Sequence, residues 1–237
     1  MSTLRQSRRT PVKGAAAALI ATLALASCQG EPSAGETETS TTSSNARTYT
    51  DDEATAALPE ADQLSDTLTI EQADEPPAIG RTDPDACTDL YFGATDILSF
   101  IDAHTVGQSQ RAYSGRDGGY LGIRIRSFDQ PVPSAWFDRA GQAVAACTSF
   151  TKYDTDRTTN WKAQLLGAAP LGEQSFSVRV VGVSPSHPLD GEVDLIRARD
   201  GHTLISVSYA VGPFSQRIPN LAERATAQTL ANLADQQ

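Results

Sequence analysis

The chain has 237 residues, 39% of them hydrophobic, and its 29 acidic residues outnumber its 19 Lys and Arg to give a formal net charge of −10 at pH 7. This balance argues against nucleic acid as a partner, because the phosphate backbone repels a negative chain. The acidity is concentrated in residues 28–86, which hold 14 acidic and 2 basic residues, whereas residues 87–237 hold 15 and 13. The folded part of the chain is therefore expected to be close to neutral.

The N-terminal 27 residues have the pattern of a lipoprotein signal peptide. A basic start precedes an apolar stretch of 13 residues at 14–26, which suits a secretory signal and is too short for a membrane-spanning helix of about 20 residues. Leu25-Ala26-Ser27-Cys28 then resembles a bacterial lipobox. The resemblance implies that Cys28 carries a diacylglycerol and anchors the protein to the extracytoplasmic face of the cell membrane. An ordinary signal peptide with an incidental cysteine is the alternative, and Sec or twin-arginine export stays open.

Residues 28–57 are dominated by Ser, Thr, Glu, Asp and Ala, with Tyr49 as the single aromatic residue. Such a segment has too little apolar surface to offset the conformational entropy that it loses on ordering. We therefore predict a disordered acidic tether over 28–57, which joins the membrane anchor to a folded domain over 58–237. That domain is long enough to build one hydrophobic core.

Cys87 and Cys147 remain once Cys28 is assigned to the lipid. An even pair in an oxidising compartment favours a disulfide, which would close a loop of about 60 residues and stabilise the fold by roughly 4 kcal/mol. The alternatives are two free buried thiols or a metal site. Two cysteines without a nearby histidine pair make a poor zinc site, so the disulfide is preferred and no metal is expected.

Residues 120–126 alternate as a half-buried strand does. Leu121, Ile123 and Ile125 share one face, and the other face carries Arg124 and Arg126. The two guanidinium groups could form a fork for a carboxylate or phosphate, which makes Arg124 and Arg126 the candidate ligand-binding residues. The alternative is an ordinary solvent-facing side, on which both arginines pair with acids of neighbouring strands.

A helix is predicted over 134–147, with Ser134 capping its first free N–H groups. At about 100° per residue its apolar side chains fall within an arc of about 120°; they are Trp136, Phe137, Ala140, Ala143, Val144 and Cys147. Cys147 is thereby expected on the buried side at the end of the helix. A bond to Cys87 would staple this helix to the N-terminal part of the domain.

The remaining elements complete the fold class. Strands are predicted at 149–153 and 176–181, and a hairpin of 192–199 with 202–211 around Asp200-Gly201. A final helix is predicted over 219–234. Strands and helices in this order predict an α+β fold, with a mainly antiparallel sheet packed with helices and one disulfide.

An ordered series of stretches runs through the chain beyond residue 60. It consists of Ala61–Leu64 leading to Ile70, then Cys87, Ser134–Phe150, Leu171–Glu173, Val193–Arg197 and Leu221–Leu233. This layout resembles the sensor-like extracytoplasmic domains of actinobacterial lipoproteins, which are related to the extracellular domain of the mycobacterial kinase PknH. The resemblance implies a sensor-like domain over 58–237 that binds or senses a ligand at the cell surface, and it supplies no catalytic residues.

No catalytic or metal-binding pattern stands out. Ser149-Phe150-Thr151-Lys152 matches the S-x-x-K motif of penicillin-recognising enzymes, but its partner motifs are absent and the stretch is predicted to be a strand. Asp154 and Asp156 offer too few oxygen ligands for a calcium loop and are assigned to a solvated turn. The histidines lack a histidine at i+3 or i+4 and are predicted to be solvent-exposed; they are His104, His187 and His202.

Two functional classes remain. The first is a non-enzymatic surface lipoprotein that binds or senses an unidentified extracytoplasmic ligand, without a cofactor. The alternative is a cell-envelope hydrolase of unrecognised type. The missing nucleophile–base pair favours the first class, whereas a pocket holding a carboxylate or histidine with a strongly shifted pKa would favour the second.

Overall fold

The computed structural model describes residues 47–71, 80–116, 118–154, 158–183, 191–213 and 215–236. The predicted signal peptide and its lipobox with Cys28 lie outside these residues, so lipid anchoring stays a prediction. His187 and Asp156 also lie outside them. No helix among the described residues has the length and apolar character needed to cross a membrane.

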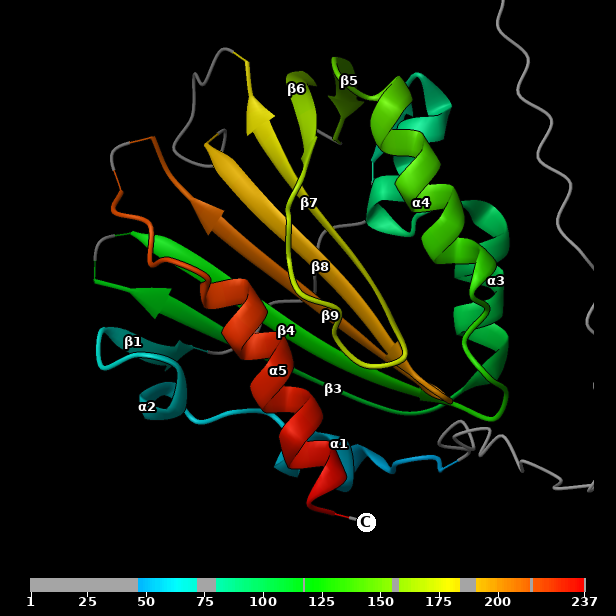
Figure 1. Cartoon of the computed structure of the whole chain (residues 1–237), viewed down its shortest axis with the longest axis vertical. Coiled ribbons are helices and arrows are strands. Elements are labelled where there is room, and N and C mark those ends of the chain that lie inside the picture. Colours follow the sequence, from blue (N-terminus) through cyan, green and yellow to red (C-terminus); the bar gives the residue numbers. More distant parts are fainter. Residues whose placement is uncertain are drawn as a thin grey trace, which may run out of the picture. The chain divides into compact units, whose positions relative to one another are not determined.

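An antiparallel sheet forms the centre of the domain (Figure 1). Within the described residues it has nine strands in the order β1-β3-β4-β9-β8-β7-β6-β5-β2. Their bounds are β1 (Leu68–Glu71), β2 (Arg81–Asp83), β3 (Thr105–Gly115), β4 (Gly119–Phe128), β5 (Phe150–Tyr153), β6 (Thr158–Leu165), β7 (Gln174–Gly182), β8 (Glu192–Asp200) and β9 (Thr203–Val211). The edge strands β1 and β2 have only 4 and 3 residues, which limits the unpaired backbone at the two edges.

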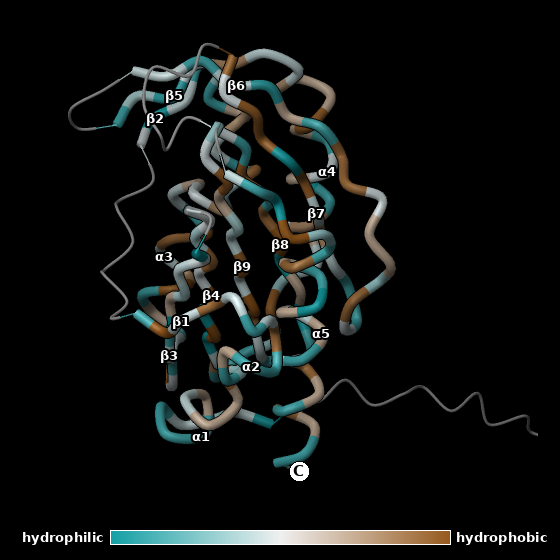
Figure 2. The backbone as a smooth tube through the Cα atoms, turned by 90° about the vertical axis from the view of Figure 1, so that its left-hand side faces the viewer, coloured by the Kyte–Doolittle hydropathy of each residue, from teal (hydrophilic) through white to brown (hydrophobic). Residues whose placement is uncertain are grey.

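Helices cover both faces of this sheet. They are α1 (Asp51–Ala56), α2 (Ala61–Leu64), the 3₁₀ helix η1 (Asp85–Tyr91), α3 (Thr95–His104), α4 (Ala135–Ala146) and α5 (Leu221–Ala234). In Figure 2, α3 and α5 lie on opposite sides of the central strands β4, β9 and β8. The α+β class and the antiparallel sheet predicted from the sequence are confirmed.

Two hydrophobic cores follow from the alternation of side chains along the strands. The first lies on what we call the α5 face of the sheet, where α5 and α1 pack; its strand residues include Tyr113, Leu121, Ile123, Ile125, Ile196, Ile205, Val207 and Tyr209. The second lies on the opposite face, here the α4 face, beneath η1, α3 and α4; its strand residues include Phe128, Phe150, Trp161, Phe176, Val178, Val180, Leu195 and Leu204.

The helix α4 buries the face that its sequence predicts. Trp136, Phe137, Ala140, Ala143 and Val144 are all buried. Ser134 stands at the N-cap position, but its side chain makes no capping hydrogen bond, so that part of the prediction is wrong.

The predicted disulfide is confirmed. Cys87 in η1 and Cys147, directly after α4, are bonded, with their Cα atoms 5.7 Å apart and a sequence separation of 60. Both residues are fully buried. The bond therefore joins two parts of the helical layer over the α4 face.

The hairpin of β8 and β9 has its turn one residue later than predicted. Asp200 pairs with Thr203, which leaves Gly201 and His202 as the two turn residues. Gly201 takes a positive φ of 56°, a conformation that glycine adopts without a steric penalty. Because this change moves each cross-strand partner by two positions, every side chain stays on its predicted face.

Several elements are absent from the sequence interpretation, among them α3, β3 and β6. The reason is clearest for β3, whose middle is polar on both faces. Gln108, Ser109, Gln110 and Arg111 follow one another there, and only Gly107, Ala112 and Tyr113 of the strand are buried. Without an apolar alternation the strand gives no period-two signal, although it is the long partner of β4.

The N-terminal boundary of the domain is the main correction to the sequence interpretation. The predicted tether over 28–57 is wrong in its last part, because residues 47–57 belong to the folded domain. Tyr49 is 2% exposed, while Ala54 and Ala57 are fully buried in the core of the α5 face. The acids that suggested disorder form the first turn of α1, where carboxylates stabilise the helix dipole.

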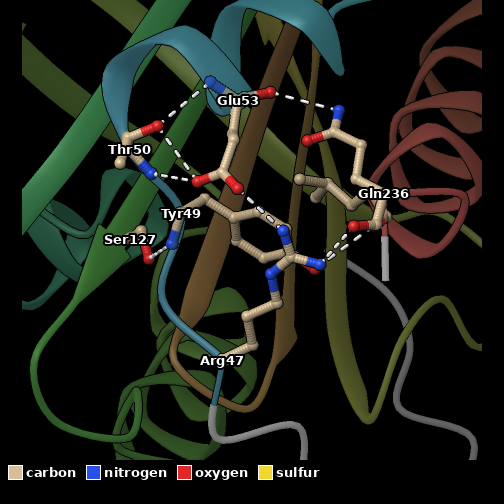
Figure 3. A network of polar contacts seen from close by, with 7 residues as sticks. Arg47, Tyr49, Thr50, Glu53, Ser127 and Gln236 are labelled. Atoms are coloured by element: carbon tan, nitrogen blue, oxygen red, sulfur yellow. Dashed lines mark hydrogen bonds and ion pairs between the residues drawn. The ribbon is translucent and has the colours of Figure 1, made fainter.

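A polar network attaches this N-terminal segment to distant parts of the chain (Figure 3). The backbone N–H of Tyr49 donates to Ser127 Oγ at 2.8 Å. Arg47 reaches the Glu53 carboxylate at 2.7 Å and the backbone carbonyl of Gln236. The Gln236 side chain in turn donates to the backbone carbonyl of Glu53 at 3.2 Å. The two ends of the described domain are thus joined directly.

Candidate functional site

Strand order brings three arginines together on the α4 face. Arg124 of β4 pairs with Ser206 of β9, and Ser206 pairs with Arg197 of β8. Neighbouring strands are about 4.8 Å apart, so the backbones of Arg124 and Arg197 lie roughly 10 Å apart across this row. Arg126 follows two residues along β4 on the same face. We refer to Arg124, Arg126 and Arg197 as the arginine cluster.

The cluster lies at the border between the covered and the open part of the α4 face. On one side of it, Phe128 and Leu204 are buried beneath the helices. On the other side the next row pairs Gly122 with Ser208, both half-buried. Beyond them Tyr120 is 39% exposed. Small side chains therefore form the part of the face that adjoins the cluster and is not covered by a helix.

Arg126 is held in an unfavourable electrostatic environment. Its half-buried position and the positive charge of Arg124 lower the pKa of its guanidinium to about 10, with Asp102 of α3 acting weakly in the opposite direction. Its Nε atom is buried and has no hydrogen-bond partner among the described residues. A donor of this kind costs free energy unless something accepts its hydrogen bond.

Arg197 is fixed by the backbone beneath it. Its Nη1 donates to the carbonyls of Ile196 at 3.0 Å and Val207 at 3.1 Å. Burial and the charges of Arg126 and Arg124 lower the pKa of its guanidinium to about 10.

The charge of Arg197 acts in turn on Tyr91 of η1. Burial raises the pKa of the Tyr91 hydroxyl, and the nearby Asp154 adds to this increase, whereas Arg197 opposes it. Tyr91 is therefore a neutral hydroxyl at the edge of the cluster.

Arg124 is oriented from the neighbouring strand. Its Nε donates to Gln110 Oε1 of β3 at 2.9 Å, and its Nη2 reaches the same oxygen. Gln110 is the direct cross-strand partner of Arg124. The Gln110 amide oxygen therefore fixes the orientation of the Arg124 guanidinium.

The absence of ion pairs among the described residues separates Arg126 and Arg197 from other arginines of the domain. Arg179 contacts Asp194 at 2.7 Å, and Arg139 contacts Asp96 at 2.8 Å. Within the described part of the chain, neither Arg126 nor Arg197 forms an ion pair. Positive charges that are half-buried and lack acidic partners suit the binding of an anion, which would accept charge-assisted hydrogen bonds.

The sequence found two of the three arginines. Its strand pattern places Arg124 and Arg126 together correctly, but the alternative of acid pairing across strands does not hold for Arg126. Arg197 was missed. The hairpin register already puts it on the face opposite Ile196, yet only the strand order β4-β9-β8 brings it beside the other two.

The histidines are less exposed than predicted. His104 is half-buried, with Nδ1 2.9 Å from Asp129 Oδ1. His202 is half-buried as well, and its Nδ1 lies 3.0 Å from the carbonyl oxygen of Phe128. The prediction of solvent-exposed side chains is wrong for both, since each packs where the α4 face meets a loop.

The other residues considered as sites in the sequence are not arranged for catalysis or metal binding among the described residues. Ser149 is exposed just before β5, so its S-x-x-K stretch does not open a helix. Lys152 forms an ion pair with Asp154 instead. In the described ranges no group of three or more His, Cys, Asp or Glu could hold a metal ion.

The carboxyl groups with shifted pKa values do not match the pattern that would favour a hydrolase. Hydrogen bonding to the Thr50 backbone lowers the pKa of Glu53, and hydrogen bonding to Arg139 lowers that of Asp96. Both causes stabilise the ionised form, as in ordinary structural contacts.

Comparisons with known proteins agree with this picture at the level of the fold. No protein-family model and no curated protein matches the chain. An X-ray structure of an uncharacterised protein from Mycobacterium smegmatis has a TM-score of 0.41 and 11% identity over 73% of this chain and 90% of that one. The extracellular domain of PknH from Mycobacterium tuberculosis has a TM-score of 0.60 and 10% identity, covering 80% of this chain and 98% of that domain. The chain therefore shares the fold of the PknH extracellular domain, as its sequence suggests.

Proposed function

We propose that this protein is a non-enzymatic lipoprotein on the extracytoplasmic face of the cell membrane, whose folded domain binds or senses an anionic ligand at the arginine cluster. The observation that carries the proposal is Arg126, a half-buried guanidinium with no acidic partner and an unsatisfied Nε among the described residues. Arg124 and Arg197 add two further cationic groups on the same face.

The fold and the disulfide support the extracytoplasmic part of this proposal. The structure with the same fold is an extracellular domain, and a buried disulfide is typical of exported proteins. The lipobox at Cys28 supplies the expected anchor, because two acyl chains give lasting membrane attachment where one gives only marginal binding. The Cys28→Ser protein should leave the membrane fraction, and full retention there would contradict the anchor.

A thermal-shift experiment tests the binding site. The full chain carrying Cys28→Ser is heated with acetate, methyl sulfate, methyl phosphate or citrate at constant ionic strength. A ligand that binds only the folded state raises Tm, by an amount equivalent to about 2.7 kcal/mol at one hundred times its Kd. We expect such an increase with at least one anion, its loss in Arg126→Gln, and its retention in the control Arg116→Gln.

Arg116 suits this control because it is exposed after β3, at the opposite end of β4 from Arg126. Its substitution removes the same charge and leaves the α4 face unchanged. Equal Tm values with and without every anion, or equal increases in all variants, would place the ligand site elsewhere. Chemical conversion of a probe by the unmodified domain would overturn the non-enzymatic assignment.

A further inference from the structure

We propose that the arginine cluster selects a doubly charged phosphate monoester group over a singly charged anion. This inference rests on the proposed function and names the chemical class of the ligand. It follows from the number and the spacing of the three guanidinium groups and from the unsatisfied Nε of Arg126 among the described residues.

The charge of the cluster calls for more than one negative charge. Arg124 and Arg126 repel each other, and both repel Arg197, while among the described residues Asp102 is the one acidic group that acts on Arg126. A monoanion would leave most of this repulsion in place, whereas a dianion removes more of it. The difference is larger here than at a fully solvated surface, because partial burial reduces the screening by water.

The hydrogen-bonding capacity points to a tetrahedral group. A phosphate monoester has three terminal oxygens, and a planar guanidinium group can donate to more than one of them. Gln110 already accepts from Nε and Nη2 of Arg124, so the donors for the ligand come from Arg126 and Arg197, and Arg124 contributes its charge. Arg126 keeps an unsatisfied Nε. Arg197 uses Nη1 for backbone carbonyls and forms no other hydrogen bond within the described residues. A single carboxylate has only two oxygens and can accept fewer of these hydrogen bonds than a phosphate group.

The open part of the face provides room for the ester substituent. Ser206 separates Arg124 from Arg197, and Gly122 and Ser208 form the next row. A Cβ atom added to Gly122 would lie 3.2 Å from Ser208 Oγ. Because Gly122 has no side chain, no atoms project from the sheet at this position. The substituent would extend over these small residues toward the exposed Tyr120.

Methyl phosphate and methyl sulfate make a matched pair of probes. They have the same tetrahedral shape, but methyl phosphate becomes a dianion above its second pKa of about 6, and methyl sulfate stays a monoanion. Isothermal titration of the full chain carrying Cys28→Ser at pH 7.5 should give at least a tenfold lower Kd for methyl phosphate. One additional charge-assisted contact contributes roughly a factor of ten to a hundred.

The pH dependence and two variants complete the experiment. The preference for methyl phosphate should shrink at pH 5, where its charge equals that of methyl sulfate. Arg126→Gln should raise the Kd for methyl phosphate at least tenfold, and Arg116→Gln should leave it unchanged.

The outcomes separate this inference from the proposed function. Equal affinity for the two probes at pH 7.5, or a preference that persists at pH 5, would overturn the selectivity for a dianion while anion binding stands. Binding of neither probe, together with no Tm increase from any anion, would overturn both. Binding that is insensitive to Arg126→Gln would remove the cluster from the site.

Discussion

The two faces of strand β4 carry different kinds of side chain in different surroundings. On the α5 face, Leu121, Ile123 and Ile125 are at most 1% exposed and are packed into a continuous apolar core. On the α4 face, Arg124 and Arg126 are half-buried and repel each other. The two sets alternate along one strand, so the same backbone supports both.

This difference shows how the domain separates stability from binding. The α5 face is closed by α5 and α1, and its burial of apolar surface is the main stabilising contribution there. The helices η1, α3 and α4 cover only part of the opposite face, and the arginine cluster lies at the edge of that cover. A domain can tolerate unfavourable charges at such an edge, because the apolar burial on the α5 face offsets the free energy that these charges cost.

The largest expected effect on stability comes from removing the disulfide that holds the helical layer over the α4 face. Cys87→Ala with Cys147→Ala removes a cross-link that closes a loop of 60 residues, and the chain-entropy model gives a loss of about 4 kcal/mol in the free energy of unfolding. Denaturant titration of the oxidised protein and the double variant measures the loss. A loss below about 1 kcal/mol would mean that the helical layer holds the α4 face without the bond.

A loss of similar or smaller size is expected from opening the closed face. Ile125→Ala leaves a cavity where a side chain is fully buried, and such truncations cost about 2–5 kcal/mol. Ile125→Val is the matched control, with a loss of about 0.5–1.5 kcal/mol. Chemical denaturation of both variants gives the comparison, and equal losses would indicate that the core relaxes around the site.

The smallest effect has the opposite sign. Arg126→Met keeps much of the side-chain volume and removes a guanidinium group whose pKa in the folded state is lowered to about 10. At neutral pH the variant should therefore be more stable by about 1–2 kcal/mol, a value reduced for partial exposure to solvent. Arg116→Met is the control and should stay within about 0.5 kcal/mol of the original protein.

The pH dependence of this gain has a defined sign. Because the folded pKa, about 10, lies below the unfolded value, the unfolded state binds more protons above pH 10, so the stability of the original protein rises as the pH increases from there. The advantage of Arg126→Met should shrink there, and it should be complete below pH 10. Thermal denaturation of both proteins at several pH values checks this. A destabilised variant at pH 7 would show that the charge is satisfied in the folded state.

Local pattern predicted much of the fold. The alternation at 120–126, the apolar arc of α4 and the pairing of Cys87 with Cys147 are all borne out. It failed where the local signal was weak or misleading. The polar middle of β3 gave no alternation. The acidic residues of α1 suggested disorder, although Tyr49, Ala54 and Ala57 are buried in the core of the domain.

By itself the sequence determined which residues alternate on each strand and helix, because side-chain periodicity is a property of the local backbone. It thereby assigned Arg124 and Arg126 to one face, and Arg197 to the face opposite Ile196. Only the tertiary structure decided that these arginines are neighbours. Their proximity depends on β9 pairing with both β4 and β8, a long-range arrangement set by the packing of the whole sheet between its helices.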